Sequence, residues 1–548
     1  MKKVVFFLLF AGVALMAGAS CSGEQGTDGG SSGPCTAGTL DCGNAVCANI
    51  LSDANNCGAC GRVCTAGQTC GNGLCTDGAT TTTGSGGSTG AGAASSSGGT
   101  GGSAGAAATG AGGSGGTGGG TGGTGGTASV TCTMNVVSDV SSVIATVGIV
   151  TWSADLAPID SAYIEFGPDE NYGLQAPVDL TEPEYRTLLL GMTASSDYHF
   201  RVVATSGNAT CMSQNYELST GPVANGIAEP SVSPALAAEV APGFLVTSRF
   251  TGGGGGGGEG QMYIYNQNGK LVWWYTPPVG GISRARMSYD GKYMIARDVN
   301  ANGAGQGQVV RVSIDGLEEE EIDIPNGHHD FTVTPDNGIV FIKKAPDNCD
   351  EIVKLAADGT QSVIYTVSDA FGGDVGGGND PCHVNTIQYN ESDDSFTFSA
   401  LNLNAYVKVT AAGNLVWVLG GNSSEFGGAG ADWDRQHGHH MLADDRILFF
   451  NNGNLGGGGG GSLALEVLLD LGTMMATRVW DYDGDNSSQT LGDVQRLPNG
   501  NTLITYSNAG VTHEVNADKA LVQEMTWPIG GAIGYVNHRP DLYGPPPR

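Results

Sequence analysis

Residues 328–338 (HHDFTVTPDNG), 383–391 (HVNTIQYNE) and 437–445 (HGHHMLADD) repeat one design, in which a histidine opens a short strand-like run that ends at a turn of acidic or amide residues. His329, His383 and His437 stand at the same place in the three segments, 54 residues apart each time. Equivalent positions in a repeat occupy equivalent places in space when the repeats surround an axis. The segments therefore predict a β-propeller with three histidines on its axis.

The turns between residue 226 and the C-terminus support the same interpretation. One kind precedes a strand that often contains tryptophan, as Asn268-Gly269 does, and the other precedes an apolar run, as Asn337-Gly338 does. Six turns of each kind occur. Two hairpin turns in a unit imply four strands, which is a propeller blade. Because helical periodicity is absent, we expect an all-β chain with a six-bladed propeller at residues 226–548, and seven blades as the alternative.

Composition and charge restrict the class of partner. Glycine accounts for 92 of the 548 residues and only 14% are charged, which is typical of turn-rich β-structure joined by low-complexity linkers. The net charge is −31 with only 23 basic residues, so the chain offers no basic surface to a nucleic acid. We therefore expect no nucleic-acid partner.

The N-terminus predicts export from the cell. Lys2 and Lys3 precede an apolar run at 4–16, which is too short to span a membrane, and small residues follow up to Cys21. Residues 1–20 therefore form a predicted signal peptide. Its end resembles a bacterial lipoprotein signal with Cys21 as the lipid-bearing residue. Because Gly18 stands where leucine is usual, secretion without an anchor is the alternative. With the lipid anchor at Cys21, residues 21–34 would be a tether.

The cysteines predict disulfides of an exported protein. Eight of the 13 fall within residues 35–75, which we interpret as a cysteine-rich module rather than as a zinc or redox site. Residues 76–128 are almost wholly Gly, Ser, Thr and Ala, a composition that cannot bury a core and predicts a linker. We expect Cys132 to pair with Cys211, and Cys349 with Cys382.

Short strand signals at 129–225 follow one another at the spacing of a β-sandwich. The segment resembles a fibronectin type III domain, with Trp152 as its core tryptophan. Nothing in it indicates catalysis.

The repeated histidines carry the candidate chemistry. In a propeller the first strand of each blade lines the central channel. The histidine strand precedes the second kind of turn, so we interpret it as that first strand. A single strand histidine is more often structural, but three at one position favour a functional site. Imidazole can act near neutral pH as nucleophile, proton carrier or hydrogen-bond donor. Alternation along a strand would turn His328 and His440 away from this position and keep His439 on the face of His437.

Five motifs together resemble the bacterial arylsulfotransferases. They are His329-Asp330, 383–385 (HVN), 417–421 (WVLGG), Gln436-His437 and 492–503 (GDVQRLPNGNTL). Each motif alone is weak, but together they extend over nearly the whole propeller.

The resemblance implies transfer of a sulfuryl group from an aryl sulfate to a phenol without a nucleotide sulfate donor. His437 would carry the sulfuryl group covalently. His329 and His383 would bind the sulfuryl oxygens and manage the phenol protons. Asn385 and Gln436 fall in the matching substrate-binding motifs. No cofactor is expected, because no glycine run is followed by the Lys-Ser or Lys-Thr of a nucleotide-binding loop. Any membrane contact would be through the lipid anchor alone.

The sequence departs from the family pattern at two places. Leu401 stands where the family has an arginine that stabilises the sulfuryl charge, and Phe450-Asn451-Asn452-Gly453 replaces Phe-Asp-Asn-Gly. The loss of one preorganised donor can lower a rate by a factor of about 100 or more. Cations that could substitute end equivalent strands or lie near the C-terminus, namely Arg249, Arg297, Lys343 and Arg539.

Two alternatives remain from the sequence. The propeller could be catalytically impaired and bind an anionic aromatic ligand or a protein partner. Three neutral imidazoles could also hold zinc with an open position and support hydrolysis, although we assign no metal ligand.

Overall fold

The computed structural model describes residues 132–545 apart from 225, 251–259, 299–306, 374, 454–460 and 529–531, together with short pieces between residues 40 and 129. The chain divides into two compact units, residues 1–97 and 98–548. In the first unit the described strands form two short antiparallel pairs, β1 (Leu40–Asp41) with β2 (Cys47–Ala48) and β3 (Gln68–Gly71) with β4 (Leu74–Asp77). The predicted signal peptide, Cys21, the tether and most of the cysteine-rich module and linker lie outside the described residues.

The described residues form an all-β structure without an α-helix, as the sequence predicts. Among them no helix is long and apolar enough to cross a membrane. Short 3-10 turns join some strands, at η1 (Pro183–Tyr185), η2 (Ala237–Glu239), η3 (Val367–Phe371), η4 (Leu401–Leu403), η5 (Ala429–Ala431) and η6 (Ser507–Ala509).

Residues 128–219 form two sheets around a shared core. One holds β6 (Met134–Val140), β7 (Gly148–Ala154) and β10 (Thr187–Leu189). The other holds β5 (Ala128–Ser129), β8 (Ser161–Gly167), β9 (Leu174–Pro177), β11 (Asp197–Ser206), β12 (Ala209–Met212) and β13 (Tyr216–Ser219). Trp152 and Phe200 are buried between them, and Cys132 and Cys211 form the predicted disulfide. The relationship to fibronectin type III domains stays a prediction.

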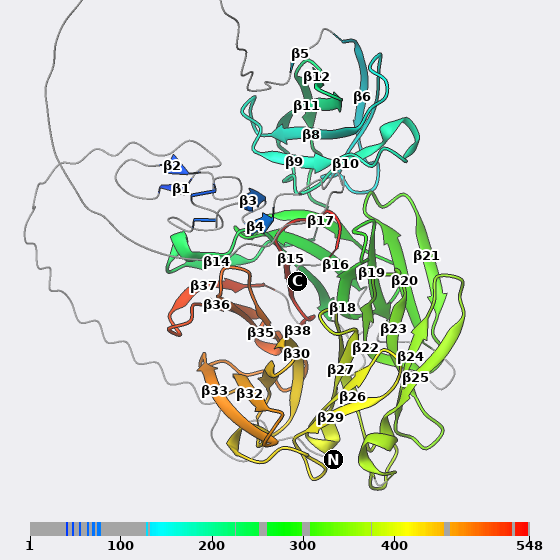
Figure 1. Cartoon of the computed structure of the whole chain (residues 1–548), viewed down its shortest axis with the longest axis vertical. Helices are drawn as coiled ribbons and strands as arrows, with labels where there is room; N and C mark the ends of the chain where they lie inside the picture. Colours follow the sequence, from blue (N-terminus) through cyan, green and yellow to red (C-terminus); the bar gives the residue numbers. More distant parts are fainter. Residues whose placement is uncertain are drawn as a thin grey trace, which may run out of the picture. The chain divides into compact units, whose positions relative to one another are not determined.

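Six further sheets follow in chain order, coloured from green to red in Figure 1. Four of them are runs of four antiparallel strands, each strand paired with the next along the chain. The second sheet holds β18 (Ile282–Met287), β19 (Tyr293–Asp298), β20 (Gln308–Ser313) and β21 (Glu319–Asp323), and the third holds β22 (Gly327–Val333), β23 (Ile339–Lys344), β24 (Asp350–Leu355) and β25 (Gln361–Thr366). The fourth holds β26 (Val384–Asn390), β27 (Ser395–Ala400), β28 (Ala405–Thr410) and β29 (Leu415–Leu419), and the fifth holds β30 (Gln436–Ala443), β31 (Arg446–Asn451), β32 (Leu463–Asp470) and β33 (Met475–Asp483).

The other two sheets use strands from both ends of this region. The strands β15 (Phe244–Phe250), β16 (Gln261–Asn266) and β17 (Leu271–Tyr275) are completed by the C-terminal β38 (Ala532–Ile533) and β39 (Asn537–Arg539). The strands β34 (Asp493–Arg496), β35 (Thr502–Tyr506), β36 (Val511–Val515) and β37 (Leu521–Thr526) gain the N-terminal β14 (Ser231–Pro234). Each end of the region thereby covers a strand edge that would otherwise be open.

A hydrophobic cluster fills each of six contacts between neighbouring sheets. Ile352 and Phe398 belong to one cluster that joins the third and fourth sheets. A cluster with Tyr263 and Leu503 joins the first sheet to the last. Because both faces of these sheets are covered, inner strands such as β27 and β35 are continuously buried rather than alternating, whereas the outer strands β21 and β33 are largely exposed.

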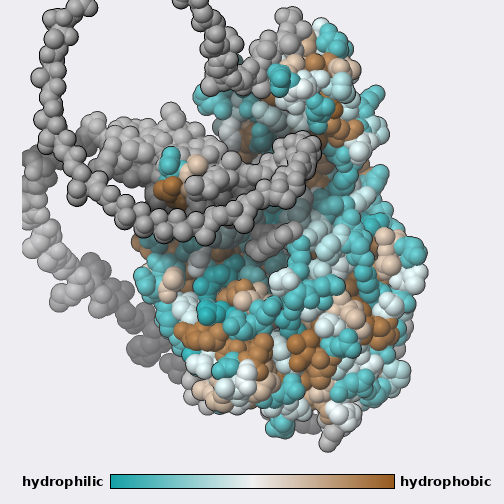
Figure 2. Space-filling model, in the orientation of Figure 1, coloured by the Kyte–Doolittle hydropathy of each residue, from teal (hydrophilic) through white to brown (hydrophobic). Residues whose placement is uncertain are grey.

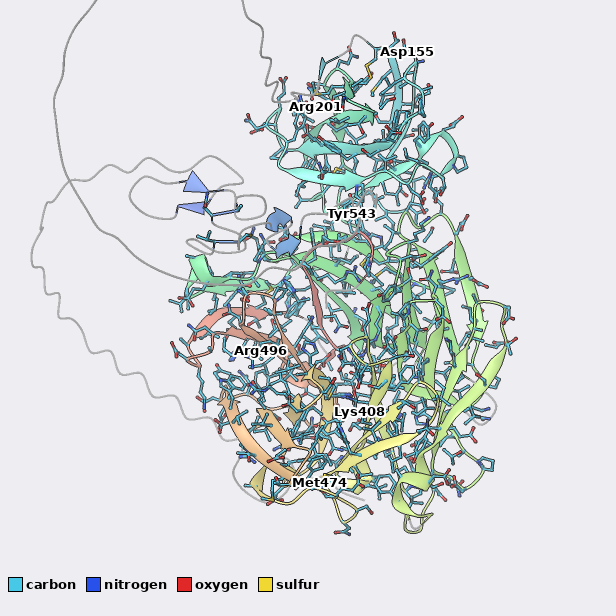
Figure 3. All side chains as sticks on the ribbon, viewed as in Figure 1. Asp155, Arg201, Lys408, Met474, Arg496 and Tyr543 are labelled. Atoms are coloured by element: carbon cyan, nitrogen blue, oxygen red, sulfur yellow. A yellow bond between two sulfur atoms is a disulfide. The ribbon has the colours of Figure 1, made fainter. Side chains whose placement is uncertain are left out.

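The outer surface carries several exposed apolar side chains. Figure 2 shows a mainly hydrophilic face with separate hydrophobic patches, and the exposed apolar side chains include Leu415 of β29 and Val479 of β33. Tyr543, labelled in Figure 3, donates its hydroxyl hydrogen to the Leu188 carbonyl (3.1 Å) and accepts a hydrogen bond from the Leu190 amide (2.9 Å). The end of the chain is therefore tied to the strand β10 segment.

Candidate active site

The structure brings the three predicted histidines together at the start of three successive first strands. His329 lies in β22, His383 immediately precedes β26, and His437 lies in β30. The ring centroids of His329 and His383 are 4.6 Å apart. Burial lowers the pKa of His329 well below its ordinary value, and the nearby His383 and His437 lower it further. The equal spacing in sequence thus corresponds to one cluster in space.

Each of the three strands is irregular at its histidine. The pairing register shifts between His328 and Phe331, between Val384 and Thr386, and between Gln436 and His439. His329 and His383 have φ values of 57° and 48°, a left-handed conformation that is uncommon outside glycine and concentrates at functional sites. A bulge breaks the alternation of side chains along a strand.

The bulge overturns one expectation from alternation. His328 was expected to point away from His329, yet their Nδ1 atoms lie 2.7 Å apart. His439 was expected on the face of His437; a register shift falls between the two residues, and Thr397 Oγ1 lies 2.8 Å from Nε2 of His439. Strand alternation therefore does not carry across these irregularities.

The surroundings of His437 fix its tautomer. The Nδ1 atom lies 2.6 Å from Oδ1 of Asn452, and the Asn452 amide donates both hydrogens to the carbonyls of Ser488 (2.8 Å) and Leu491 (2.9 Å). Since the amide has no hydrogen left, Nδ1 of His437 must donate, and Nε2 keeps its lone pair. Burial lowers the pKa of His437 to about 3, with a contribution from His383. The ring is neutral near pH 7, and its Nε2 lone pair gives it the chemistry that a nucleophile needs.

His383 is paired with a carboxylate. Its Nδ1 lies 2.5 Å from Oδ2 of Asp380, and Lys344 forms an ion pair with the other oxygen of Asp380. Partial burial raises the pKa of Asp380, but the contacts from His383 and Lys344 outweigh it and hold the pKa well below its usual range. An aspartate that accepts from Nδ1 orients an imidazole and stabilises the imidazolium that forms when Nε2 takes a proton.

His329 is linked to a carboxylate through its neighbour. Nε2 of His328 lies 2.8 Å from Oδ1 of the buried Asp350. A carboxylate only accepts, so Nε2 of His328 carries the hydrogen and its Nδ1 accepts from Nδ1 of His329. His329 is thereby left with a lone pair on Nε2.

The two predicted amide residues lie in the same region but are engaged by the protein. Asn385 donates to the Gln436 carbonyl (2.8 Å), while its buried Oδ1 has no hydrogen-bond partner among the described residues. Gln436 donates to the carbonyls of Ala400 and Ala405 and accepts from Trp433 Nε1. Asn385 thus keeps one free acceptor, whereas both ends of the Gln436 amide are used.

The four predicted cations are dispersed. Arg297 donates to the Gly327 carbonyl (2.9 Å), and its charge contributes to the lowered pKa of His329. Lys343 pairs with Gly327 across the sheet. Arg249 lines a separate cavity of 120 Å³ with Tyr263 and Trp527. Arg539 donates to the carbonyls of Asp541, Gly544 and Pro545. Of the four, Arg297 is the one that acts electrostatically on the histidines.

Sequence reasoning missed the arginine next to the third histidine. The charge of the exposed Arg435 contributes to the lowered pKa of His437, after burial and His383. Arg435 has a φ of 62°, and its amide donates to Oδ1 of Asn404 (2.9 Å), the residue that ends the turn η4 begun by Leu401. The signal was its position two residues before His437.

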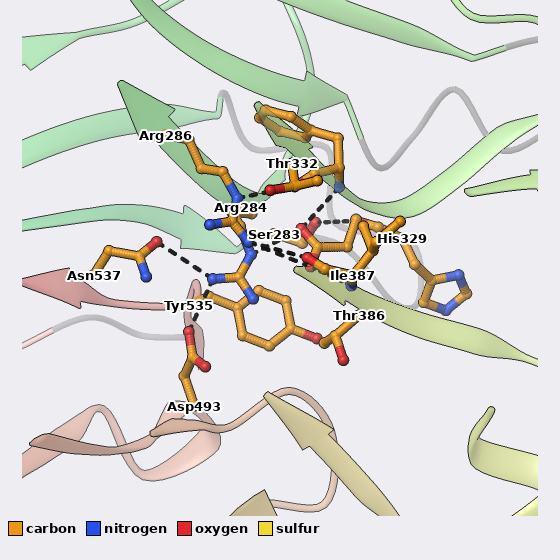
Figure 4. Close-up of polar contacts among 12 residues, drawn as sticks. Ser283, Arg284, Arg286, His329, Thr332, Thr386, Ile387, Asp493, Tyr535 and Asn537 are labelled. Carbon is orange, nitrogen blue, oxygen red and sulfur yellow. Dashed lines mark hydrogen bonds and ion pairs between the residues drawn. The ribbon is translucent and has the colours of Figure 1, made fainter. Parts of the chain in front are cut away.

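A buried charge network lies beside the histidines and was also missed (Figure 4). Arg284 forms ion pairs with Asp330 (2.8 Å) and Asp493 (2.9 Å), and its guanidinium lies 3.8 Å from the Tyr535 ring centre. Ser283 donates to the His329 carbonyl (3.0 Å). Asp330 and Asp493 occur in the motifs quoted above, so acidic residues at the strand starts were a usable signal.

Beyond this network the same strands line a cavity of 810 Å³, whose lining includes Arg286, His439, Asp493 and Arg539 but none of the three histidines. Within the described ranges, no three His, Cys, Asp or Glu side chains gather as metal ligands would. The three-histidine metal alternative therefore has no geometric support there.

Comparison with known proteins gives one extensive match. The model of the arylsulfotransferase (ASST) family matches residues 254–531. The model of the stigma-specific STIG1-like protein family matches residues 25–96, which hold the cysteine-rich segment. No curated protein matches the chain.

Several solved structures show weak similarity. A periplasmic gluconolactonase from Pseudomonas aeruginosa shares 12% identity over 69% of this chain and 99% of its own, with a TM-score of 0.38. Virginiamycin B lyase from Staphylococcus aureus shares 14% over 55% and 89%, with a TM-score of 0.33. A protein of unknown function from Bacteroides caccae shares 13% over 54% and 98%, with a TM-score of 0.38.

Proposed function

The chain belongs to the arylsulfotransferase family, and from this we propose that it transfers a sulfuryl group from a phenolic sulfate ester to a phenol through a sulfohistidine at His437. The observation that carries the proposal is the Nε2 lone pair of a neutral His437, fixed by Asn452. Such an imidazole can attack the sulfur of an anionic ester where a charged imidazolium cannot.

We assign proton transfer to His383. In the first step Nε2 of His437 attacks sulfur and the bond from sulfur to the aryl oxygen breaks. The departing oxygen takes a proton from Nε2 of His383, and the phenol leaves. In the second step His383 takes the hydroxyl proton of the acceptor phenol, whose oxygen attacks sulfur as the bond to Nε2 of His437 breaks. Both steps balance, and the enzyme returns to its first state.

We further propose that the six sheets are the blades of a closed propeller. Support comes from the clusters between neighbouring sheets, the cluster that joins the last sheet to the first, and the C-terminal strands that complete the first sheet. In this arrangement the axis passes the three histidines and the charge network.

Because Leu401 offers no donor to the sulfuryl oxygens, we assign that charge to Arg435. It stands two residues from His437 and is anchored to the end of the turn that Leu401 begins. The second candidate function follows from the absence of the family arginine at position 401. Without that charge the propeller would bind an anionic aromatic ligand but not turn it over.

The disulfides Cys132–Cys211 and Cys349–Cys382 are typical of an exported protein. We propose a lipid anchor at Cys21, a tether, the cysteine-rich module at 35–75 and the linker at 76–128, which would hold the sandwich and propeller away from a membrane.

The proposal is tested by incubation of the full chain with a chromogenic aryl sulfate and a phenol acceptor. We expect continued colour release that depends on the acceptor, ping-pong kinetics, and loss of both in His437→Ala. Binding of the aryl sulfate without turnover would instead support the second candidate. Activity that survives in His437→Ala would exclude His437 as the nucleophile.

A further inference from the structure

A continuous series of polar contacts leads from His383 into the interior. Nδ1 of His383 lies 2.5 Å from Oδ2 of Asp380, whose Oδ1 forms an ion pair with Lys344. Nζ of Lys344 also lies 2.8 Å from Oδ1 of Asp350. One lysine therefore bridges two carboxylates, and each of these carboxylates contacts a histidine.

The series returns to the second histidine of the cluster. Oδ1 of Asp350 lies 2.8 Å from Nε2 of His328, and Nδ1 of His328 lies 2.7 Å from Nδ1 of His329. The rings of His329 and His383, at the two ends of the series, are themselves in edge contact at 4.6 Å between centroids. The contacts thus form a closed circuit.

Asp350 is the buried centre of this circuit. It is fully buried. Its Oδ1 contacts Lys344 and His328, and its Oδ2 accepts a hydrogen bond from the Val384 amide (2.8 Å). Three donors satisfy a carboxylate that would otherwise be costly to bury. Burial lowers the pKa of Lys344, but Asp350 and Asp380 outweigh burial and raise it, so the bridging ammonium stays charged.

The second disulfide clamps the two segments that carry the carboxylates. Cys349 directly precedes Asp350, and Cys382 lies between Asp380 and His383 in a run of four residues. Both cysteines are fully buried and bonded to each other. The cross-link therefore fixes the distance between Asp350 and the loop that presents His383.

The circuit dictates different roles for the two histidines. His383 touches a carboxylate directly, so it can carry a proton on Nε2 with compensation of its charge. His329 is separated from Asp350 by His328, and its single hydrogen, on Nδ1, is used. It has no hydrogen to offer a sulfuryl oxygen, and its Nε2 accepts.

We propose that Asp380, Lys344 and Asp350 form one positioning unit, clamped by Cys349–Cys382, that makes His383 the proton carrier and leaves His329 a neutral imidazole that accepts at Nε2 and donates nothing to the sulfuryl oxygens. This inference rests on the proposed function. It differs from the expectation that both histidines donate to the sulfuryl oxygens.

Substitutions of the unit test the role of His383. In Asp380→Asn we expect sulfohistidine formation from esters of weakly acidic phenols to fall about 100-fold, because these phenols need a proton to leave. Esters of nitrophenols, which leave without one, should react nearly as in the wild type. Lys344→Met should act in the same direction and Lys344→Arg should restore most of the rate.

Matched controls separate positioning from general damage. Lys354 has the same side-chain exposure as Lys344, 32%, and pairs with Asp336 on the same sheet, so Lys354→Met should change neither substrate class. Cys349→Ser/Cys382→Ser should reproduce the leaving-group dependence, whereas Cys132→Ser/Cys211→Ser in the sandwich should not. Equal loss for both ester classes, or no loss in Asp380→Asn, would overturn the role given to His383.

The role of His329 is tested in the unmodified protein. Nitrogen-15 NMR of the full chain, assigned with His329→Gln, should show His329 as the neutral tautomer with its hydrogen on Nδ1. A hydrogen on Nε2 would overturn the inference. If the wild-type protein forms no sulfohistidine, the proposed function itself fails. If the sulfohistidine forms but the leaving-group dependence and the Nδ1 hydrogen of His329 are not found, only the inference fails.

Discussion

His437 places Nδ1 2.6 Å from Oδ1 of Asn452, and both amide hydrogens of Asn452 are already used by backbone carbonyls. The asparagine can therefore only accept from the imidazole. This contact decides which ring nitrogen faces the substrate, and the proposed chemistry depends on it.

Asn452→Ala should slow sulfohistidine formation by at least about 10-fold, because His437 is then free to adopt the other tautomer. The three lost buried hydrogen bonds should also lower the free energy of unfolding by about 1–3 kcal/mol. Stopped-flow phenol release and denaturant unfolding measure the two effects. Asn451→Ala, one residue earlier, should leave the rate intact; an equal slowing in both variants would refute the role of Asn452.

The lowered pKa of His437 sets the pH dependence of the first half-reaction. The proposed nucleophile is the neutral imidazole, whose pKa is lowered from 6.5 to about 3, so the reactive form predominates well below the ordinary histidine range. His383, Arg435 and Asn452 are the groups that act on it. With a nitrophenyl sulfate, which needs no acid, the rate of phenol release should stay level from about pH 8 to about pH 5. A fall centred on the ordinary value of 6.5 would contradict this.

Arg435→Met should lower the rate of transfer by about 10-fold or more if its guanidinium stabilises the charge of the transferring group. Arg435→Lys should retain much of the rate because the charge is kept. Arg478→Met removes another exposed arginine, which donates to the Asp432 carbonyl, and should have no effect. Steady-state kinetics with one donor and one acceptor distinguish these outcomes, and a rate unchanged in Arg435→Met would reassign the charge to Arg297.

Arg284→Met should destabilise the protein strongly. Its removal leaves Asp330 and Asp493 buried without their shared partner, which costs about 3–5 kcal/mol. Arg311→Met instead breaks an exposed pair with Glu320 and should cost no more than about 1 kcal/mol. Chemical denaturation of the full chain measures both, and equal midpoints for the two variants would show that the network adds no stability.

The repeat could be recognised from the sequence because its interval is regular and its turns are rich in Asn, Asp and Gly. That was enough to predict the all-β class, the position of the three histidines at the starts of first strands, and both described disulfides. These features depend on local turn chemistry and on spacing, which a single sequence displays.

The details of the site depend on tertiary structure that the sequence does not display. The alternation rule assumes regular pairing, so it misplaced His328 at the bulge. The sequence also indicated Lys343 as a candidate cation, whereas it is the next residue, Lys344, that bridges the carboxylates. Asp380 lies in a glycine-rich loop without periodicity. Its contact with His383, three residues later, depends on the conformation of that loop.

The most direct measurement is to incubate the full chain with an aryl sulfate donor and no acceptor, digest it, and map the added sulfuryl group by mass spectrometry. The account predicts one group on His437, which a phenol then removes and which His437→Ala never acquires. A group found on another residue, or none despite phenol release, would contradict the account.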